Sequence, residues 1–338
     1  MGSGMKKCLF LLIAFTLISC NIFNPPAGPV ADLTFDKQIL EDVCVVSLAF
    51  ESDGTAWMGT LGGYGGNMGG LLRYATDNTE SFFTSQNSMI SDSSTIWDLD
   101  IDSEGRVWIA NEGLVCYQNG SFTRYDTSNS PIPQNSIRSI AIDSDDKIWF
   151  SAGGLISYDH HDFTVYTTAN SDLPSEIILD IEIDNDNNIW LAFPDRICKF
   201  DGEAWTSYTK SQLGLGLGSG MLRDIGINAE NVVCGILDYS LSSLMPPAVD
   251  KPVVFTFDGT SSDVAPGDSS SLFMRLFVDS DDNIWCFGIN KEIRVYSAHD
   301  LNAFSKHELS FSPFMTAESP DGDMWISGGS DGVYIYRK

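Results

Sequence analysis

One pattern constrains this chain more than any other: a hairpin-like stretch that recurs along most of its length. In residues 141–150, AIDSDDKIWF, alternating apolar residues lead into a turn of Ser and Asp, and a second strand opens on Ile148 and Trp149. Turn-forming polar residues between runs of β-branched and aromatic residues are typical of a β-hairpin. Seven copies of this frame are anchored at Trp57, Trp108, Trp149, Trp190, Cys234, Trp285 and Trp325, with Cys in place of Trp in the fifth.

The spacing of these copies predicts the fold. Successive anchors are 51, 41, 41, 44, 51 and 40 residues apart, and the third copy divides into expected strands at 137–143, 148–150, 155–158 and 163–167. A period of about 40 to 50 residues with several short strands per copy is the signature of a β-propeller. Apolar residues alternate with a period of two, and no stretch keeps a helical period. We therefore expect an all-β fold, a seven-bladed β-propeller.

The two ends of the repeat array predict how the ring closes. The last copy stops at its third strand, GVYIYR at 332–337, whereas residues 33–36 fit the outermost strand that normally ends a repeat. A strand from each end, paired in one sheet, leaves no open sheet edge. We therefore predict that residues 33–36 complete the last blade, and that the propeller covers residues 31–338.

The first thirty residues are expected to be a targeting segment. Residues 1–4 precede a second candidate start at Met5, so they are either an added sequence or a miscalled beginning. A basic pair and an apolar run of twelve residues follow. That run is too short to cross a bilayer core of about 30 Å as a helix. We expect residues 1–19 to be a signal peptide and the Pro-rich residues 20–30 to be a tether.

The end of the signal peptide, Leu17-Ile18-Ser19-Cys20, resembles the bacterial lipobox. This resemblance implies that Cys20 becomes the mature N-terminus and carries a lipid, and that Asn21 favours delivery to the outer membrane. A plain signal peptide with an incidental Cys is the alternative. The expected location is the cell envelope, with the membrane contacted through the lipid alone.

Composition limits the partners of the protein. The chain carries 19 Lys and Arg against 46 Asp and Glu, a formal net charge of −27. An acidic chain repels phosphate backbones, so we expect no nucleic-acid partner. The bland alternative is that scattered Asp and Asn simply serve turns and solubility. We also expect a monomer.

Several features imitate functional motifs without their full spacing. The acidic turns at 184–188 and 279–283 lack the Gly and Glu of an EF-hand loop, so we predict hairpin turns there. The glycine clusters at 62–70 and 214–220 lack the spacing of nucleotide-binding loops. The four His residues form neither a Ser-His-Asp set nor a metal-ligand spacing. We therefore expect no catalytic residues, no metal and no cofactor.

The innermost strands predict the most specific site. At the position of Ile140, the first six copies carry apolar residues, which alternation should pack between blades. The residue before this position should face the channel mouth, with the next one back beside it. Aligned in this way, the charged and aromatic residues at the mouth are Trp97, Asp98, Arg138, Asp180, Arg223, Asp224 and Arg275. Such a mixture suits a polar small ligand, for instance a sugar, although the charges could instead pair and hold the blades together.

Two long loops extend the same face. They follow the second strand of the first and fifth copies, at 60–70 and 236–251, on the side where fourth strands cross to the next blade. Long loops at one end of a rigid scaffold commonly carry binding. We therefore add Tyr64 and Tyr239 to the expected ligand-binding residues, and regard 244–247 as a segment that would dock another protein.

The repeat frame resembles a known family. An apolar strand, D-x-(D/E)-(G/N), a W-I-(G/A) strand, G-L-x-x-Y and F-x-x-Y are similar to the two-component regulator propeller repeat over residues 31–338. The resemblance implies a relative of the periplasmic sensor regions of hybrid histidine kinases, known especially from Bacteroidetes. We expect a free-standing lipoprotein of this type without a kinase.

Three functional hypotheses follow. The first is a non-catalytic, membrane-anchored propeller that binds a small polar ligand, such as a glycan, or an envelope protein on its loop-rich face. The second is a lyase or hydrolase that uses the channel-mouth carboxylates as acid and base. Two close carboxyls with a raised pKa at Asp98, Asp180 or Asp224 would favour it. The third is a structural or assembly scaffold.

Overall fold

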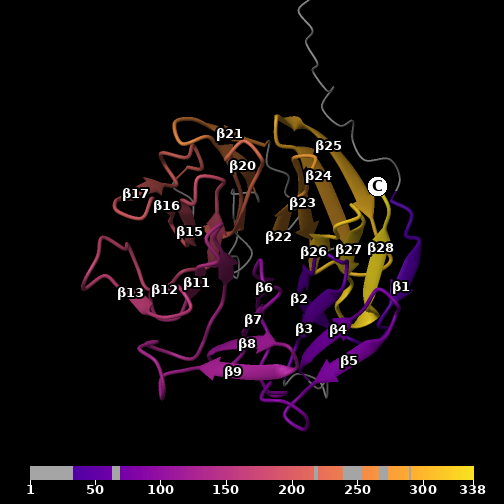
Figure 1. Cartoon of the computed structure of the whole chain (residues 1–338). Helices are drawn as coiled ribbons and strands as arrows, with labels where there is room; N and C mark the ends of the chain where they lie inside the picture. The colour runs from indigo at the N-terminus through magenta and orange to yellow at the C-terminus, as the bar shows by residue number, and fades with distance from the viewer. Residues whose placement is uncertain (1–32, 63–68, 217–219, 239–252, 266–272, 289–290) are drawn as a thin grey trace, which may run out of the picture.

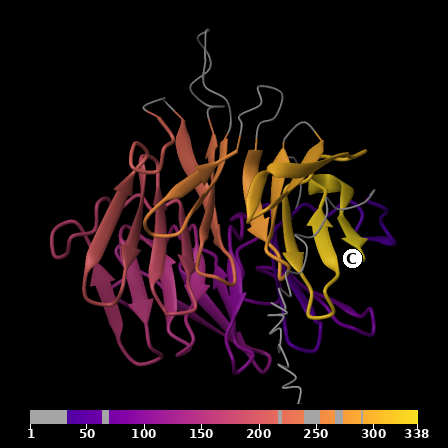
Figure 2. The same ribbon diagram turned by 90° about the horizontal axis from the view of Figure 1, so that it is seen from above.

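The computed structural model describes residues 33–62, 69–216, 220–238, 253–265, 273–288 and 291–338, which form seven four-stranded antiparallel sheets. The sheets stand as blades around a central axis (Figures 1 and 2). Neighbouring blades contact one another through their innermost strands around the whole ring. The prediction of an all-β, seven-bladed propeller is confirmed. Within the described residues, no helix has the length and apolar character needed to cross a membrane.

Each blade orders its strands from the axis to the rim, and the blades are numbered 1 to 7 along the chain. The innermost strands are β2 (Val45–Phe50), β6 (Leu99–Ile101), β10 (Ile140–Ile142), β14 (Asp180–Ile183), β18 (Met221–Ile227), β22 (Phe273–Val278) and β26 (Met315–Glu318). The second strands are β3 (Ala56–Thr60), β7 (Val107–Ala110), β11 (Ile148–Ser151), β15 (Ile189–Phe193), β19 (Val233–Asp238), β23 (Asn283–Gly288) and β27 (Met324–Ser327). The third strands are β4 (Leu71–Tyr74), β8 (Leu114–Gln118), β12 (Leu155–Tyr158), β16 (Arg196–Phe200), β20 (Val253–Phe257), β24 (Glu292–Ser297) and β28 (Val333–Tyr336). The outer strands are β5 (Glu80–Phe83), β9 (Ser121–Tyr125), β13 (Phe163–Tyr166), β17 (Trp205–Thr209), β21 (Ser262–Val264), β25 (Asp300–Glu308) and β1 (Lys37–Ile39), and a 3-10 turn, Gly329–Asp331, precedes β28.

The ring closes by pairing the two ends of the propeller, as predicted. Strand β1 pairs antiparallel with β28, with Ile39 opposite Val333, and Figure 1 shows the two side by side. The predicted boundary is wrong, because none of residues 33–36 is strand and β1 begins at Lys37, four residues after the predicted start. The Asp36 amide nevertheless donates to the Ile335 carbonyl at 2.9 Å, just before the strand. Phe35 instead packs its ring against Phe311 and Tyr334, at centroid distances of 5.5 and 5.4 Å. This aromatic contact anchors the chain before the strand begins.

We expect Ile39→Ala to lower the free energy of unfolding by about 2–3 kcal/mol, because it leaves a cavity at the closing strand. Ile39 is only 7% exposed and belongs to the core between blades 7 and 1. Ile39→Val should cost about 1 kcal/mol, and urea unfolding measures both. Equal stability of all three proteins would show that β1 does not hold the ring closed.

Apolar residues at the Ile140 position pack between blades, as predicted. In the first six blades these side chains are at most 9% exposed, and each lies in a hydrophobic cluster. Ile140, for example, packs with Trp108 and Cys116 of the preceding blade. The alternate residues point to the opposite face of each sheet. Ala141, for example, packs with Trp149 and Ile181 at the next junction.

The repeated Trp is fixed by a carboxylate six residues before it. In blade 3, Asp143 accepts the amides of Asp145 and Lys147, both at 3.0 Å, and the Trp149 indole Nε1 at 2.8 Å. The same Asp–Trp bond forms in blades 2, 4 and 6, at 2.8, 2.9 and 2.8 Å. The calcium-like segments at 184–188 and 279–283 are therefore hairpin turns closed by this bond, as predicted.

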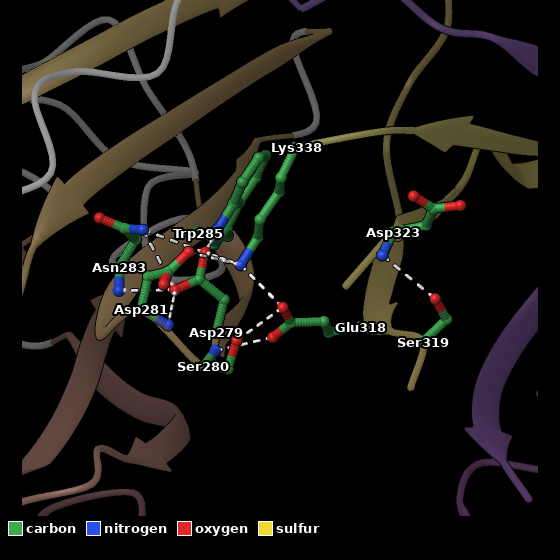
Figure 3. A network of polar contacts seen from close by, with 9 residues as sticks. All are labelled: Asp279, Ser280, Asp281, Asn283, Trp285, Glu318, Ser319, Asp323 and Lys338. Atoms are coloured by element: carbon green, nitrogen blue, oxygen red, sulfur yellow. Dashed lines mark hydrogen bonds and ion pairs between the residues drawn. The ribbon is translucent and has the colours of Figure 1, made fainter. Parts of the chain in front are cut away.

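These turns also link neighbouring blades on the face opposite the channel mouth. At the seam of blades 6 and 7, the amide and hydroxyl of Ser280 both donate to Glu318 at 2.7 Å (Figure 3). Lys338 Nζ lies 2.8 Å from Glu318, 2.9 Å from Asp279 and 3.2 Å from Asp281. Ionic and hydrogen-bonded contacts of this kind bind the last blade to the one before it.

Candidate functional site

The innermost strands enclose a cavity of about 320 Å³ that receives side chains from all seven blades. Of the predicted residues, it is lined by Trp97, Asp98, Arg138, Asp180, Asp224 and Arg275. Arg223 does not line it. This residue lies at a register shift between β18 and β19, and such a bulge re-aims a side chain. Tyr64 and Tyr239, like Cys20 and residues 244–247, lie outside the described residues.

Three channel carboxylates each join their own blade to the following one, at three of the seven junctions. In each case the amide at the Ile140 position of one blade donates to an Asp of the preceding blade. The pairs are Ile140 with Asp98 at 2.8 Å, Ile225 with Asp180 at 2.9 Å, and Leu276 with Asp224 at 2.7 Å. Because these amides are buried, each needs an acceptor.

Ser139 performs the same role where blade 3 meets blade 4. Its Oγ accepts the Ile181 amide at 3.1 Å and donates to Asp180 at 3.2 Å. Asp224 is also paired with Arg275, whose Nη1 lies 3.2 Å from its Oδ1. The geometry therefore favours the alternative interpretation of the Asp residues, in which they hold the blades together. Most of these bonds, however, run to backbone amides rather than to other charges.

Burial gives the channel carboxyls unusual pKa values. It raises the pKa of Asp98 to about 6, although the Ile140 amide and the Arg275 charge act in the opposite direction. The pKa of Asp180 is also well above its ordinary value, first because of burial and then because of the neighbouring Asp224 charge. Raised carboxyl pKa values are what the enzyme hypothesis predicts. The carboxyl oxygens of Asp98 and Asp180, however, already accept hydrogen bonds from backbone amides, so these two raised pKa values also fit a structural role.

Sequence reasoning missed two further acids in the channel, Asp100 and Glu182. Both line the cavity one tier deeper, two residues after Asp98 and Asp180 on the same strands. Burial raises the pKa of Asp100 to about 7, and burial followed by the nearby carboxyls raises that of Glu182 well above its ordinary value. The period of two along a strand was the signal that could have located them.

The arginines at the mouth differ in how their charge is balanced. Burial alone would lower the pKa of the Arg275 guanidinium, but the charges of Asp224, Asp180 and Asp98 hold it above its ordinary value. The pKa of Arg138 is lowered, first by burial and then by the positive charges of Arg275 and Arg223. Arg138 Nε donates to the Leu179 carbonyl at 3.1 Å, which fixes the base of its guanidinium.

A second cavity of about 270 Å³, here called the side cavity, opens beside the mouth and shares Trp97 and Arg138 with the central one. The residues that line the side cavity also include Gln134, Ser136, Glu176 and Ile177. Trp97 is 44% exposed and Ile177 is 65% exposed. Exposed apolar side chains beside a charged cavity are typical of a binding site.

Other chemistry-bearing residues do not gather at the mouth. Cys44, Cys116, Cys198, Cys234 and Cys286 are free thiols, of which all but Cys44 are buried. Across the described ranges, no group of three or more His, Cys, Asp or Glu side chains is placed to hold a metal ion.

Residues 131–154, which run from the connection into blade 3 through its second strand, match the family model described as "Two component regulator propeller". The chain carries a two-component regulator propeller repeat. This match gives independent support to the resemblance found in the repeat frame. No curated protein matches the chain.

Several solved structures are similar to this chain in fold. The extracellular domain of the putative hybrid two-component system BT4673 from B. thetaiotaomicron has a TM-score of 0.69 and 16% identity over 90% of this chain. The corresponding domain of BT3049 from the same organism has a TM-score of 0.65 and 16% identity over 88% of the chain. The surface component PorZ of the type-IX secretion system of Porphyromonas gingivalis has a TM-score of 0.63 and 12% identity over 91% of this chain. This chain spans 40%, 39% and 48% of the lengths of these three structures.

Proposed function

We propose that the protein is a cell-envelope recognition propeller that binds a small polar ligand, such as a glycan, at the channel mouth without transforming it. The observation that carries this proposal is the pair of adjoining cavities that share Trp97 and Arg138. An exposed indole offers a stacking face, and the guanidinium offers directed hydrogen-bond donors. The rigid ring of blades holds both in place before a ligand arrives, which reduces the entropic cost of binding.

The comparisons support an envelope location. Two structural neighbours are extracellular domains of two-component systems, and a third is a bacterial surface component. A lipid on Cys20 and delivery to the outer membrane belong to the same proposal. Recognition of an envelope protein through residues 244–247 remains the prediction made from the sequence.

We expect Trp97→Ala to weaken binding of a neutral oligosaccharide at least about fivefold, because loss of a stacking ring costs about 1 kcal/mol or more. A glycan array followed by calorimetric titration of each hit measures this. The melting temperature should shift by no more than about 2 °C, since the indole is largely exposed.

Phe304→Ala is the matched control. Phe304 is 41% exposed on the outer strand β25, away from the mouth, so its removal should leave binding unchanged. Equal loss in both variants, or no loss in either, would contradict binding at the mouth. Product formation that disappears in Asp100→Asn would instead establish the lyase or hydrolase hypothesis.

A further inference from the structure

The side cavity joins three blades at the point where the channel opens. Trp97 comes from blade 2, Arg138 from blade 3 and Ile177 from blade 4, so no single repeat contains the cavity. It contains one guanidinium, that of Arg138, and two exposed apolar side chains, Trp97 and Ile177. Its volume of about 270 Å³ is enough for a single ring with a short substituent.

Arg138 is held in place but keeps hydrogen-bonding capacity. Its Nε is fixed by the Leu179 carbonyl, while in the described part of the chain no carboxylate lies within ion-pair distance of it. This is unusual in a protein with 46 acidic residues and 19 basic ones. By contrast, Arg275 is paired with Asp224 at 3.2 Å. A planar guanidinium fixed at its base presents two parallel N–H donors, the geometry that matches a carboxylate.

Two guanidiniums near Arg138 favour an incoming anion. Arg275 and Arg223 repel its positive charge, while the carboxyls of Asp180 and Asp224 act in the opposite direction. An anion bound at Arg138 would relieve the repulsion. The acidic group in the cavity, Glu176, is exposed and accepts the Thr168 amide at 3.1 Å, so one of its oxygens is engaged elsewhere.

We propose that the side cavity binds a carboxylate carried on a ring, with the carboxylate on Arg138 and the ring between Trp97 and Ile177. This inference rests on the proposed function and specifies the chemistry of its ligand. The ring can belong to a sugar acid or to an aromatic acid, since both present a carboxylate beside a face that an indole can cover. The neutral analogue of either compound keeps the ring contact and loses the ionic one.

Two matched pairs of probes test this: glucuronate against glucose, and benzoate against benzamide. Ligand-observed NMR titration should show at least one of the two acids binding at least tenfold more tightly than its neutral partner. The preference should shrink as NaCl rises from about 20 to about 200 mM, because salt screens a partly exposed ion pair. The pair that shows the larger preference for its acid tells whether the natural ligand carries a sugar ring or an aromatic ring.

Three variants locate the preference. Arg138→Gln should abolish it, and Arg138→Lys should keep part of it. Lys147→Gln is the control, since it removes the same charge as Arg138→Gln. It should keep all of the preference, because Lys147 lies over Trp149 at the opposite end of the same hairpin. Melting temperatures verify that each variant is folded.

Equal binding of acid and neutral probes by the wild-type protein would overturn the inference while leaving the proposed function standing. A preference that survives in Arg138→Gln would overturn it as well. If none of the four probes binds, the inference also fails, whereas the proposed function is judged separately by the neutral oligosaccharides and Trp97→Ala.

Discussion

Asp180→Ala is expected to lower the free energy of unfolding by about 3 kcal/mol, because buried amides that lose their acceptor each cost about 1–3 kcal/mol. Asp180 accepts the Ile225 amide of the next blade at 2.9 Å and the Ile181 amide at 3.0 Å. Ile181 keeps a second acceptor in Ser139, whereas Ile225 does not have one among the bonds of the described residues. The loss should therefore fall mainly on the junction of blades 4 and 5.

Asp180→Asn separates the hydrogen bond from the charge. The amide oxygen of Asn can accept the Ile225 amide, and its NH₂ can donate to Ser139 Oγ, so Asn reproduces the protonated carboxyl. We expect the Asn variant to unfold within about 1 kcal/mol of the wild type near pH 5. Urea unfolding of the three proteins measures both effects. If Ala and Asn cost the same, the blade-to-blade bond is not what Asp180 contributes.

Much of the fold follows from the sequence because each repeat is a local unit. The hairpin frame around Trp149 uses turn chemistry and alternation that operate over a few residues, so its copies could be counted directly. Ring closure followed from the missing fourth strand of the last blade. The register of β1 did not, because it depends on how the rings of Phe35, Phe311 and Tyr334 pack, a contact between distant parts of the chain.

The candidate site was predictable in composition but not in bonding. Alternation placed Asp98, Asp180 and Asp224 on the channel side of their strands, where the structure has them. It could not show that their oxygens accept amides from the next blade, because that depends on the stagger between neighbouring sheets. Arg223 was misplaced for a related reason, since a bulge interrupts the period of two. The side cavity was not predicted, because three separate repeats form it.

We expect the propeller to lose about 3 kcal/mol of stability between about pH 4 and about pH 7, because the channel acids must then ionise. The pKa values of Asp98 and Asp100 are raised from 3.8 to about 6 and about 7. A pKa that is higher in the folded state than in the unfolded state adds stability below the ordinary value. That stability is lost as the pH rises through the folded-state value, which places the window between about pH 4 and about pH 7.

Acids with the opposite shift act outside this window. The pKa of Asp258, for example, lies below its ordinary value because the amides of Ser261 and Thr260 donate to its carboxylate. Stability from such groups is present above the ordinary pKa and is lost only as the solution becomes more acidic than about pH 4. The two sets together predict a stability maximum near pH 4.

Asp100→Asn tests the assignment, because it removes one ionisation without removing the acceptor for the Ile101 amide. The variant should lose about half as much stability as the wild type over the same pH range, measured by urea unfolding at constant ionic strength. Asp321→Asn removes an equal charge from an exposed turn, so it accounts for the general repulsion in a chain of net charge −27 and should keep the full loss. If the free energy of unfolding of Asp100→Asn depends on pH as strongly as that of the wild type, Asp100 is not buried as a neutral group. The deeper part of the channel would then be hydrated and charged.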